Sequence, residues 1–179
     1  MIVLTIKKQD MIYPGHLVNV KENLLFAFRK VNSPLLILLT VAINLIFSLS
    51  VTYLSHQAGY RVRTNFLQFE SIRQELFAVA IFAPIVETFV FQYFLINLTI
   101  SLTKLVIKGG STILAILIPA VAFGLVHPYN YIYMANTFLT GLLLNTFYMI
   151  IKYRKHDAFT CTALVHALYN LSVFTIGHI

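Results

Sequence analysis

One segment limits the fold of this chain more than any other: Pro34–Leu54 contains no charged residue and is long enough to cross a bilayer. A membrane-spanning helix needs about 20 consecutive apolar residues. Similar stretches fill most of the remaining chain, so that 59% of the 179 residues are hydrophobic and only 11% are charged. Soluble domains carry about 25% charged residues, and a soluble fold this short has too small a core to bury so much apolar surface. The sequence therefore predicts an integral membrane protein.

The apolar stretches predict an all-α fold, a polytopic transmembrane helical bundle of about five spans. The predicted spans are, by residue number, 34–54, 76–98, 112–127, 131–151 and 158–179. Two more segments, 20–30 and 61–76, place apolar residues at helical spacing beside charged ones, which predicts one or two amphipathic helices on the membrane surface. No internal repeat or low-complexity tract divides the chain, so residues 1–179 are expected to form a single membrane-embedded domain.

The basic residues, which give the chain a net charge of +7, lie in short clusters between the apolar stretches. This distribution is typical of topology signals and of contacts with the lipid bilayer, and we expect no nucleic-acid partner. With the N-terminus inside, the inner segments hold ten of the 13 Lys and Arg residues, which favours an N-inside orientation. Because Cys161 is the only cysteine, an internal disulfide and a thiolate metal cluster are excluded.

Glu87 is an acidic residue near the middle of the second predicted span. A charged residue at that depth costs about 2.5–3.5 kcal/mol on insertion scales, and such residues normally face the bundle interior and pair with another polar group. His127 ends the third span, while His166 and Asn170 lie four residues apart in the fifth and so share one helix face. A lone histidine in an apolar helix is usually a packing residue, but two histidines with a carboxylate and an amide indicate a functional site.

These four side chains predict a hydrolytic site. A carboxylate or an imidazole takes a proton from water, and imidazole N–H and amide N–H groups donate hydrogen bonds to a developing oxyanion. A proton-coupled carrier is an alternative use of Glu and His residues in a membrane. It needs a continuous polar path, and the first and fourth spans offer only scattered Asn and Thr residues for one.

The other polar residues of the spans are interpreted as structural. Three asparagines are expected to form hydrogen bonds between helices: Asn44, Asn136 and Asn145. Three tyrosines cluster in the manner of an aromatic belt at the membrane surface: Tyr129, Tyr131 and Tyr133.

Three short motifs occur in the order seen in one known family. Glu87 opens a segment, ETFVFQ, that stands where the family has EExxxR; Phe123 and His127 match FxxxH, and His166 and Asn170 match HxxxN. The motif core, residues 84–170, therefore resembles the CAAX-protease and bacteriocin-processing (CPBP) family, also called type II CAAX prenyl endopeptidases or intramembrane glutamic proteases.

The resemblance implies an intramembrane endopeptidase, a hydrolase of the glutamate type. Glu87 and His127 would activate a water molecule for attack on a peptide carbonyl, and His166 and Asn170 would stabilise the resulting oxyanion. The substrate would be a leader-bearing peptide or a membrane-anchored protein. The compact chain is similar to the prokaryotic members, which implies a prokaryotic cytoplasmic membrane.

Three further residues are expected to support the site, and two of them depart from the family pattern. Thr88 replaces the second Glu of EExxxR and Gln92 replaces the Arg, while Phe123 retains the first position of FxxxH. Because Thr88 and Gln92 are four residues apart, we expect a neutral hydrogen-bonded pair in place of an ion pair. Because both charges are absent together, no buried charge is left without a partner, which makes the change compatible with activity.

No cofactor is expected. Glu87, His127 and His166 would supply three zinc ligands and leave a position for water, but the chain has no HExxH helix and zinc is not favoured. A non-catalytic membrane scaffold, immunity or peptide-maturation protein with the same fold remains the alternative, and its support is the altered pair Thr88 and Gln92.

The depths of the two histidines pose a geometric test. At about 1.5 Å per residue, His127 would lie roughly 22–24 Å from the inner end of its span and His166 only about 12 Å from the inner end of its own. Straight helices would therefore separate them by roughly 10 Å in depth. Tilted helices, a kink at Pro119 or a later start of the fifth span would close this gap, and without one of them the four-residue site fails.

Overall fold

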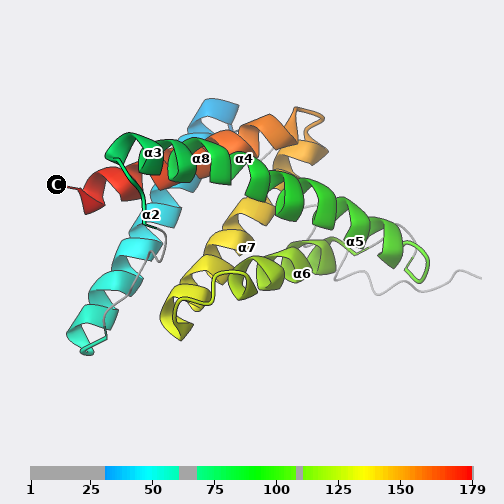
Figure 1. Ribbon diagram of the computed structural model, residues 1–179. Helices are drawn as coiled ribbons and strands as arrows, with labels where there is room; N and C mark the ends of the chain where they lie inside the picture. Colours follow the sequence, from blue (N-terminus) through cyan, green and yellow to red (C-terminus); the bar gives the residue numbers. More distant parts are fainter. Residues whose placement is uncertain (1–30, 61–67, 108–110, 179) are drawn as a thin grey trace, which may run out of the picture. The chain divides into compact units, whose positions relative to one another are not determined.

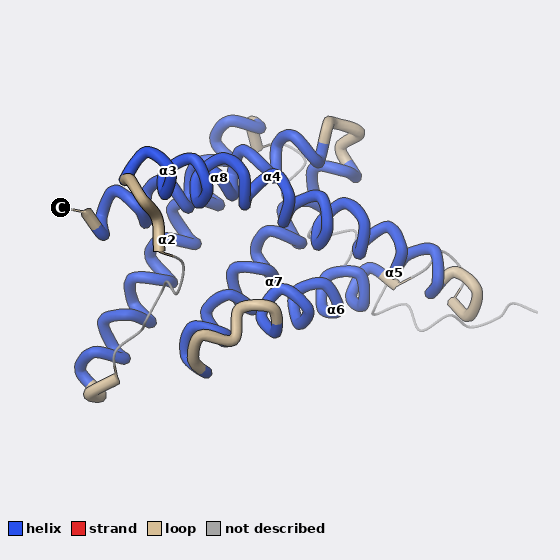
Figure 2. The backbone as a smooth tube through the Cα atoms, in the orientation of Figure 1, coloured by secondary structure: helices blue, strands red, loops and turns tan. Residues whose placement is uncertain are grey.

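The computed structural model describes residues 31–60, 68–107 and 111–178, and every regular element within these ranges is a helix (Figure 2). Almost all of them belong to one contact unit, Asn32–Ile179. The prediction of a single domain over residues 1–179 stays a prediction, because residues 1–30 lie outside the described part. The same holds for the predicted surface helix at residues 20–30.

Within the described residues, four helices are long and apolar enough to cross a membrane, and a fifth apolar helix is shorter. The long ones are α2 (Ser33–Gln57), the composite helix α3–α5 (Ile72–Thr103), α7 (Tyr131–Tyr153) and α8 (Ala158–Gly177) (Figure 1). Helix α6 (Thr112–Leu125) has 14 residues and is therefore about 21 Å long, less than the roughly 30 Å of a hydrocarbon core. The predicted helical membrane bundle is confirmed, with its third span shorter than expected.

Side-chain caps explain where most of these helices begin. In each case the capping oxygen accepts a hydrogen bond from the backbone N–H three residues later, which satisfies one of the free donors of the first turn. The capping residues are Ser71, Ser111, Asn130 and Asp157. Asn32, the residue before α2, makes no such hydrogen bond, and α2 begins with Pro34 in its first turn.

Asp157 caps α8 outside the membrane-spanning segment. The Thr160 hydroxyl and the Thr160 N–H both donate to its carboxylate, and these hydrogen bonds hold the Asp157 pKa below its usual range. A carboxylate whose pKa is lowered by folding stabilises the fold above its unfolded pKa. This contribution is therefore present at neutral pH and is lost as the pH falls through the lowered value.

The prediction of a surface helix over residues 61–76 is wrong in its described part. Residues 68–70 are not helical, Ser71 has an extended backbone, and the helix begins at Ile72. Residues 61–67 lie outside the described ranges. The apolar stripe toward residue 76 belongs to the second span, which is thus longer than predicted, because the Ser71 cap is a stronger local signal than the periodicity that runs across it.

The composite helix is irregular on both sides of Glu87. It consists of α3 (Ile72–Phe77), a π-helical segment η1 (Ala78–Phe82), α4 (Ala83–Glu87), a second π-helical segment η2 (Thr88–Leu95) and α5 (Ile96–Thr103). In a π-helix each N–H bonds to the carbonyl five residues earlier, which widens the turn and changes which side chains share a face. Glu87 therefore lies where the helix changes its winding.

Polar side chains connect the helices, as predicted for the three asparagines. Thr140 donates to Asn44 at 3.0 Å, and Asn136 donates to the Ser48 hydroxyl at 3.0 Å. Asn145 donates to a backbone carbonyl of α6 at 2.8 Å. Hydrogen bonds of this kind stabilise helix contacts in lipid, where water does not compete for the polar groups.

Small residues allow α6 and α7 to approach closely. A Cβ atom on Gly124 would lie 2.9 Å from Cβ of Phe138, and one on Gly141 would lie 3.2 Å from Cα of Ala120. Close backbone approach through small residues is a common way to pack membrane helices. This contact holds α6, and the turn that follows it, against α7.

Candidate functional site

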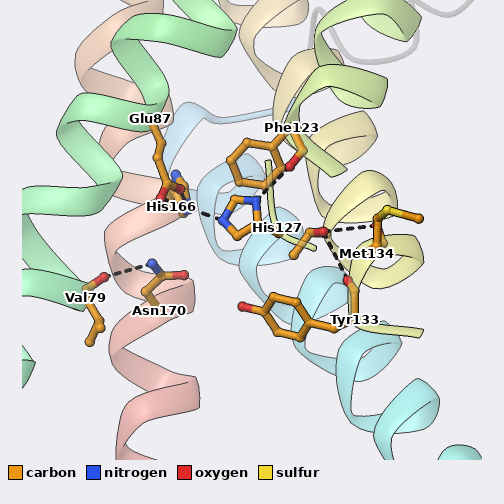
Figure 3. Close-up of polar contacts among 9 residues, drawn as sticks. Val79, Glu87, Phe123, His127, Tyr133, Met134, His166 and Asn170 are labelled. Atoms are coloured by element: carbon orange, nitrogen blue, oxygen red, sulfur yellow. Dashed lines mark hydrogen bonds and ion pairs between the residues drawn. The ribbon is translucent and has the colours of Figure 1, made fainter. Parts of the chain in front are cut away.

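Three separate parts of the fold bring a carboxylate and two imidazoles together. Glu87 is the last residue of α4, His127 lies in the turn after α6, and His166 is on the buried face of α8 (Figure 3). Nε2 of His127 is 3.8 Å from Oε1 of Glu87, and Nε2 of His166 is 3.5 Å from Oε2 of Glu87. Each carboxylate oxygen thus faces one imidazole.

The two histidines lie much closer together than their predicted depths along the spans suggest. Both imidazoles lie within 4 Å of the same carboxylate, so a separation of roughly 10 Å does not occur. The helices are inclined to one another rather than parallel, which is visible for α7 and α8 (Figure 1). Depth counted along straight, parallel helices is therefore not preserved. Pro119, the other feature expected to close the gap, lies inside α6.

A backbone hydrogen bond fixes the orientation of His127. Its Nδ1 lies 2.7 Å from the carbonyl oxygen of Phe123, one helical turn earlier. Because a carbonyl only accepts, Nδ1 carries a proton, and in the neutral ring Nε2 is left with a lone pair. That lone pair faces Glu87. A hydrogen bond between the two side chains therefore needs one proton, which they share.

His166 is almost fully buried, with 2% of its surface exposed. Its Nε2 faces Glu87, while its Nδ1 has no hydrogen-bond partner among the described residues. The Phe123 ring packs against both imidazoles, with centroid distances of 4.8 Å to His127 and 5.9 Å to His166. Phe123 therefore contacts both rings by packing, and its backbone carbonyl accepts a hydrogen bond from His127; its supporting role stays a prediction.

Asn170 lies one turn after His166, and its amide is used for a helix contact. Nδ2 of Asn170 donates to the carbonyl oxygen of Val79 at 2.8 Å (Figure 3). In η1 the Ala83 N–H bonds to Ala78 O, five residues earlier. The next such bond would join Pro84 to Val79, but proline has no N–H. Asn170 thus satisfies the carbonyl that Pro84 leaves free, and its second amide N–H remains as a donor.

The expected hydrogen-bonded pair of Thr88 and Gln92 does not form. Gln92 instead donates through Nε2 to Oδ1 of Asn145 at 3.0 Å, and Thr88 Oγ1 has no partner among the described residues. The reason is the π-helical winding of Thr88–Leu95, in which residues four apart no longer lie directly above one another. Both side chains are fully buried, and Gln92 connects the helix that carries Glu87 to α7.

Tyr133 is a residue of the site that the sequence reasoning placed elsewhere. Tyr131 is 87% exposed, as an aromatic belt requires. The Tyr133 ring, however, packs 6.1 Å from the His127 ring and 5.0 Å from the Tyr129 ring. Its hydroxyl points toward the side of the site where Asn170 lies (Figure 3). The available signal was spacing, because helical residues two apart point to different faces.

Access to the site is partial. The side chains of Glu87 and His127 are 24% and 15% exposed, so the carboxylate is not sealed inside the bundle. Among the described residues, no group of three or more His, Cys, Asp or Glu side chains is arranged to hold a metal ion. Metal independence stays a prediction.

These side chains can take up a proton and return it beside the carbonyl group of a bound substrate. A family model described as "Type II CAAX prenyl endopeptidase Rce1-like" matches residues 70–172 of the chain. This range contains all three motifs and confirms the resemblance seen in the sequence. No curated protein and no solved structure gives a significant match.

Proposed function

This chain belongs to the Rce1-like type II CAAX prenyl endopeptidase family, and from that premise we propose that Glu87 and His127 activate a water molecule to cleave a peptide bond. Family membership together with the apolar helices makes the chain an integral membrane protein and, in general terms, a membrane endopeptidase. The proposal adds the residues and their roles.

The observation that carries the proposal is the convergence of three chain segments on one carboxylate. Glu87 faces His127 at 3.8 Å and His166 at 3.5 Å. Placing an acid in an apolar helix is costly, and the fold adds two imidazoles from other elements around it. A packing role would need only one hydrogen-bonding neighbour for Glu87.

In the proposed reaction Glu87 accepts a proton from water while the water oxygen bonds to the peptide carbonyl carbon. His127 shares this proton, since its Nε2 lone pair faces the carboxylate. The carbonyl oxygen becomes an oxyanion, which the Nε2–H of His166 and the free amide N–H of Asn170 stabilise. The shared proton then passes to the peptide nitrogen, the C–N bond breaks, and a carboxylic acid and an amine are released.

The remaining parts of the proposal concern the setting. The reaction uses no cofactor and no metal ion, so that a chelator such as EDTA leaves the rate unchanged. The substrate is a leader-bearing peptide or a membrane-anchored protein. The chain lies in a prokaryotic cytoplasmic membrane with its N-terminus inside, which the uneven distribution of Lys and Arg supports.

The test is a comparison of peptide termini in membranes that contain the wild type, Glu87→Gln or His127→Ala at equal levels. Glu75→Gln is a matched control, because Glu75 lies on the same composite helix, is 25% exposed and has a histidine Nε2 at 3.5 Å. We expect new termini with the wild type and Glu75→Gln only. Identical termini in all four membranes would refute the proposal and favour the non-catalytic scaffold.

A further inference from the structure

A cavity of about 500 Å³ lies away from the Glu87 site, between the α5 part of the composite helix, the end of α7 and the start of α8. Asn97, in its wall, follows Glu87 by ten residues along the composite helix. The cavity-lining residues Ser101, Lys152 and Ala158 lie within two residues of a helix end, and helix ends are where membrane helices reach the lipid headgroups. None of the residues of the proposed reaction lines it.

The cavity contains a lysine held in a defined position. Lys152 Nζ donates to Oδ1 of Asn97, and it lies 5.9 Å from the centroid of the Tyr148 ring. Asn97 in turn donates to the Tyr148 hydroxyl at 3.3 Å. An ammonium group has three donors, and within the described residues Lys152 takes part in no salt bridge. Two of its N–H groups thus remain for a ligand.

The charge around the cavity is positive. Four of the five Lys and Arg residues in the described ranges lie at this end of the bundle: Lys104, Lys152, Arg154 and Lys155. His156 also lines the cavity. Asp157 lines the cavity as well and is the only acid there in those ranges, and Thr160 already donates twice to its carboxylate. An anion of the size of a phosphate group is therefore favoured here.

One part of the cavity wall is apolar and exposed. Phe94 and Leu98 line it and are 52% and 39% exposed. A ligand that places an anionic group against Lys152 would therefore continue along an apolar, lipid-facing surface. A free phosphate ion would leave this wall unused, whereas a phospholipid fills both parts.

We propose that this cavity binds the headgroup of an anionic phospholipid, with the phosphate at Lys152 and an acyl chain along Phe94 and Leu98. Basic pockets between membrane helices at headgroup level are recognised sites for anionic lipids. The lipid would fasten α5 to the α7–α8 turn, and α8 carries His166. The site is independent of the proposed reaction, since no residue is shared.

The experiment uses the full chain in neutral detergent micelles and measures binding of phosphatidylglycerol, phosphatidylcholine or glycerol phosphate by native mass spectrometry. We expect saturable binding of phosphatidylglycerol alone. Lys152→Gln should raise its Kd at least about fivefold, and Lys152→Arg should restore binding. Arg73→Gln, which removes one charge from the other end of the composite helix, should leave the Kd unchanged.

Equal binding of phosphatidylcholine, or an equal loss in Arg73→Gln, would overturn the proposal in favour of non-specific lipid contact. Equal binding of glycerol phosphate would identify a soluble anion as the ligand. A footprint on the wild type needs no variant: phosphatidylglycerol should protect the Lys152 amine, but not Lys155, from acetylation. Unprotected Lys152 would refute the site even if Lys152→Gln does not fold.

A second inference rests on the proposed function and concerns the oxyanion. Asn170 has already given one amide N–H to Val79, so only the second of its two N–H groups is left for the oxyanion. The Tyr133 hydroxyl points into the site, and its ring packs 6.1 Å from the His127 ring (Figure 3). We infer that Tyr133 is a catalytic residue that donates its O–H hydrogen bond to the oxyanion and keeps its proton throughout.

The test is Tyr133→Phe, which keeps the ring beside His127 and removes only the hydroxyl. The probe is a fluorogenic peptide that carries a cleavage site found in the comparison of peptide termini, cleaved by the purified full chain. Loss of one oxyanion donor lowers kcat about 10²-fold or more, and we expect KM to stay within about twofold. The control is Tyr131→Phe, which changes an outward-facing hydroxyl on the same helix and should leave kcat unchanged.

A merely structural Tyr133 would lower thermal stability or raise KM instead of lowering kcat. If Tyr133→Phe keeps the wild-type kcat while His127→Ala is inactive, the role of Tyr133 is refuted and the proposed function stands. If the wild type cleaves no more of the probe than His127→Ala does, the proposed function fails and the Tyr133 role fails with it.

Discussion

The hydrogen bond between Asn170 and Val79 predicts a coupling between two residues that are far apart in the sequence. Asn170 donates to a carbonyl 91 positions earlier, and that carbonyl is free because Pro84 has no N–H. Replacing Asn170 by alanine leaves the carbonyl without a partner in a partly buried setting. The expected loss of unfolding free energy is about 1–2 kcal/mol, within the range for an unsatisfied buried polar group.

The same substitution should cost less in a Pro84→Ala background. The Pro84→Ala change supplies a backbone N–H that can reach Val79, so the carbonyl regains a partner within its own helix. We expect the cost of Asn170→Ala to fall to about 0.5 kcal/mol or less, which is a coupling energy of about 1 kcal/mol in a double-mutant cycle.

Equilibrium unfolding in mixed micelles with increasing sodium dodecyl sulfate measures these free energies. Asn136→Ala is the control, because its hydrogen bond to Ser48 does not involve Val79 and its cost should be equal in both backgrounds. An equal cost of Asn170→Ala in the wild-type and the Pro84→Ala backgrounds would refute the reasoning. Activity separates the two roles of Asn170: if it also stabilises the oxyanion, Asn170→Ala stays slow when Pro84→Ala has restored stability.

The remaining predictions concern the carboxylate, the connection to α7 and the contact between α6 and α7. Glu87→Gln should lower kcat/KM by about 10³-fold, or about 4 kcal/mol, with no loss of stability; retention of more than about a tenth of the activity would contradict a base role. Gln92→Leu should lower the unfolding free energy by about 1–3 kcal/mol, because it removes the donor to buried Asn145. The same unfolding assay measures this change. An unchanged free energy would mean that water replaces the amide. Gly124→Ala should lower the unfolding free energy by about 1–3 kcal/mol, since its new Cβ would lie 2.9 Å from a neighbouring side-chain carbon. The control Gly177→Ala places its Cβ in open space and should leave the free energy unchanged. Equal thermal stability of the two variants would show that α6 moves freely.

Helix positions could be predicted because their signals are local. The uncharged run Pro34–Leu54 lies inside α2, and the predicted starts at residues 112, 131 and 158 agree with α6, α7 and α8. Serine, asparagine and aspartate at these starts bond to their own backbone three residues on, so no other part of the chain is needed. The start of the second span was missed because periodicity on both sides of Ser71 concealed its cap.

The residues of the candidate site could be identified from the free-energy cost of placing polar groups in apolar helices. An acid and two histidines in apolar helices are unfavourable unless something compensates them, and the motif order pointed to the same residues. Their contacts could not be derived this way. Whether Glu87 meets both histidines depends on how three helices incline, and that inclination results from packing such as the close approach at Gly124.

The sequence by itself determined that the chain is helical, that lipid is part of its solvent, and which polar residues are too costly in lipid to be incidental. The tertiary structure decided what those residues touch: Asn170 bonds to Val79, Gln92 to Asn145 rather than to Thr88, and Tyr133 turns toward His127. The physical reason is the distance along the chain over which each interaction acts. Hydrophobicity, capping and proline act over a few residues of one helix, whereas these contacts depend on π-helical winding and on helices brought together from distant parts of the chain.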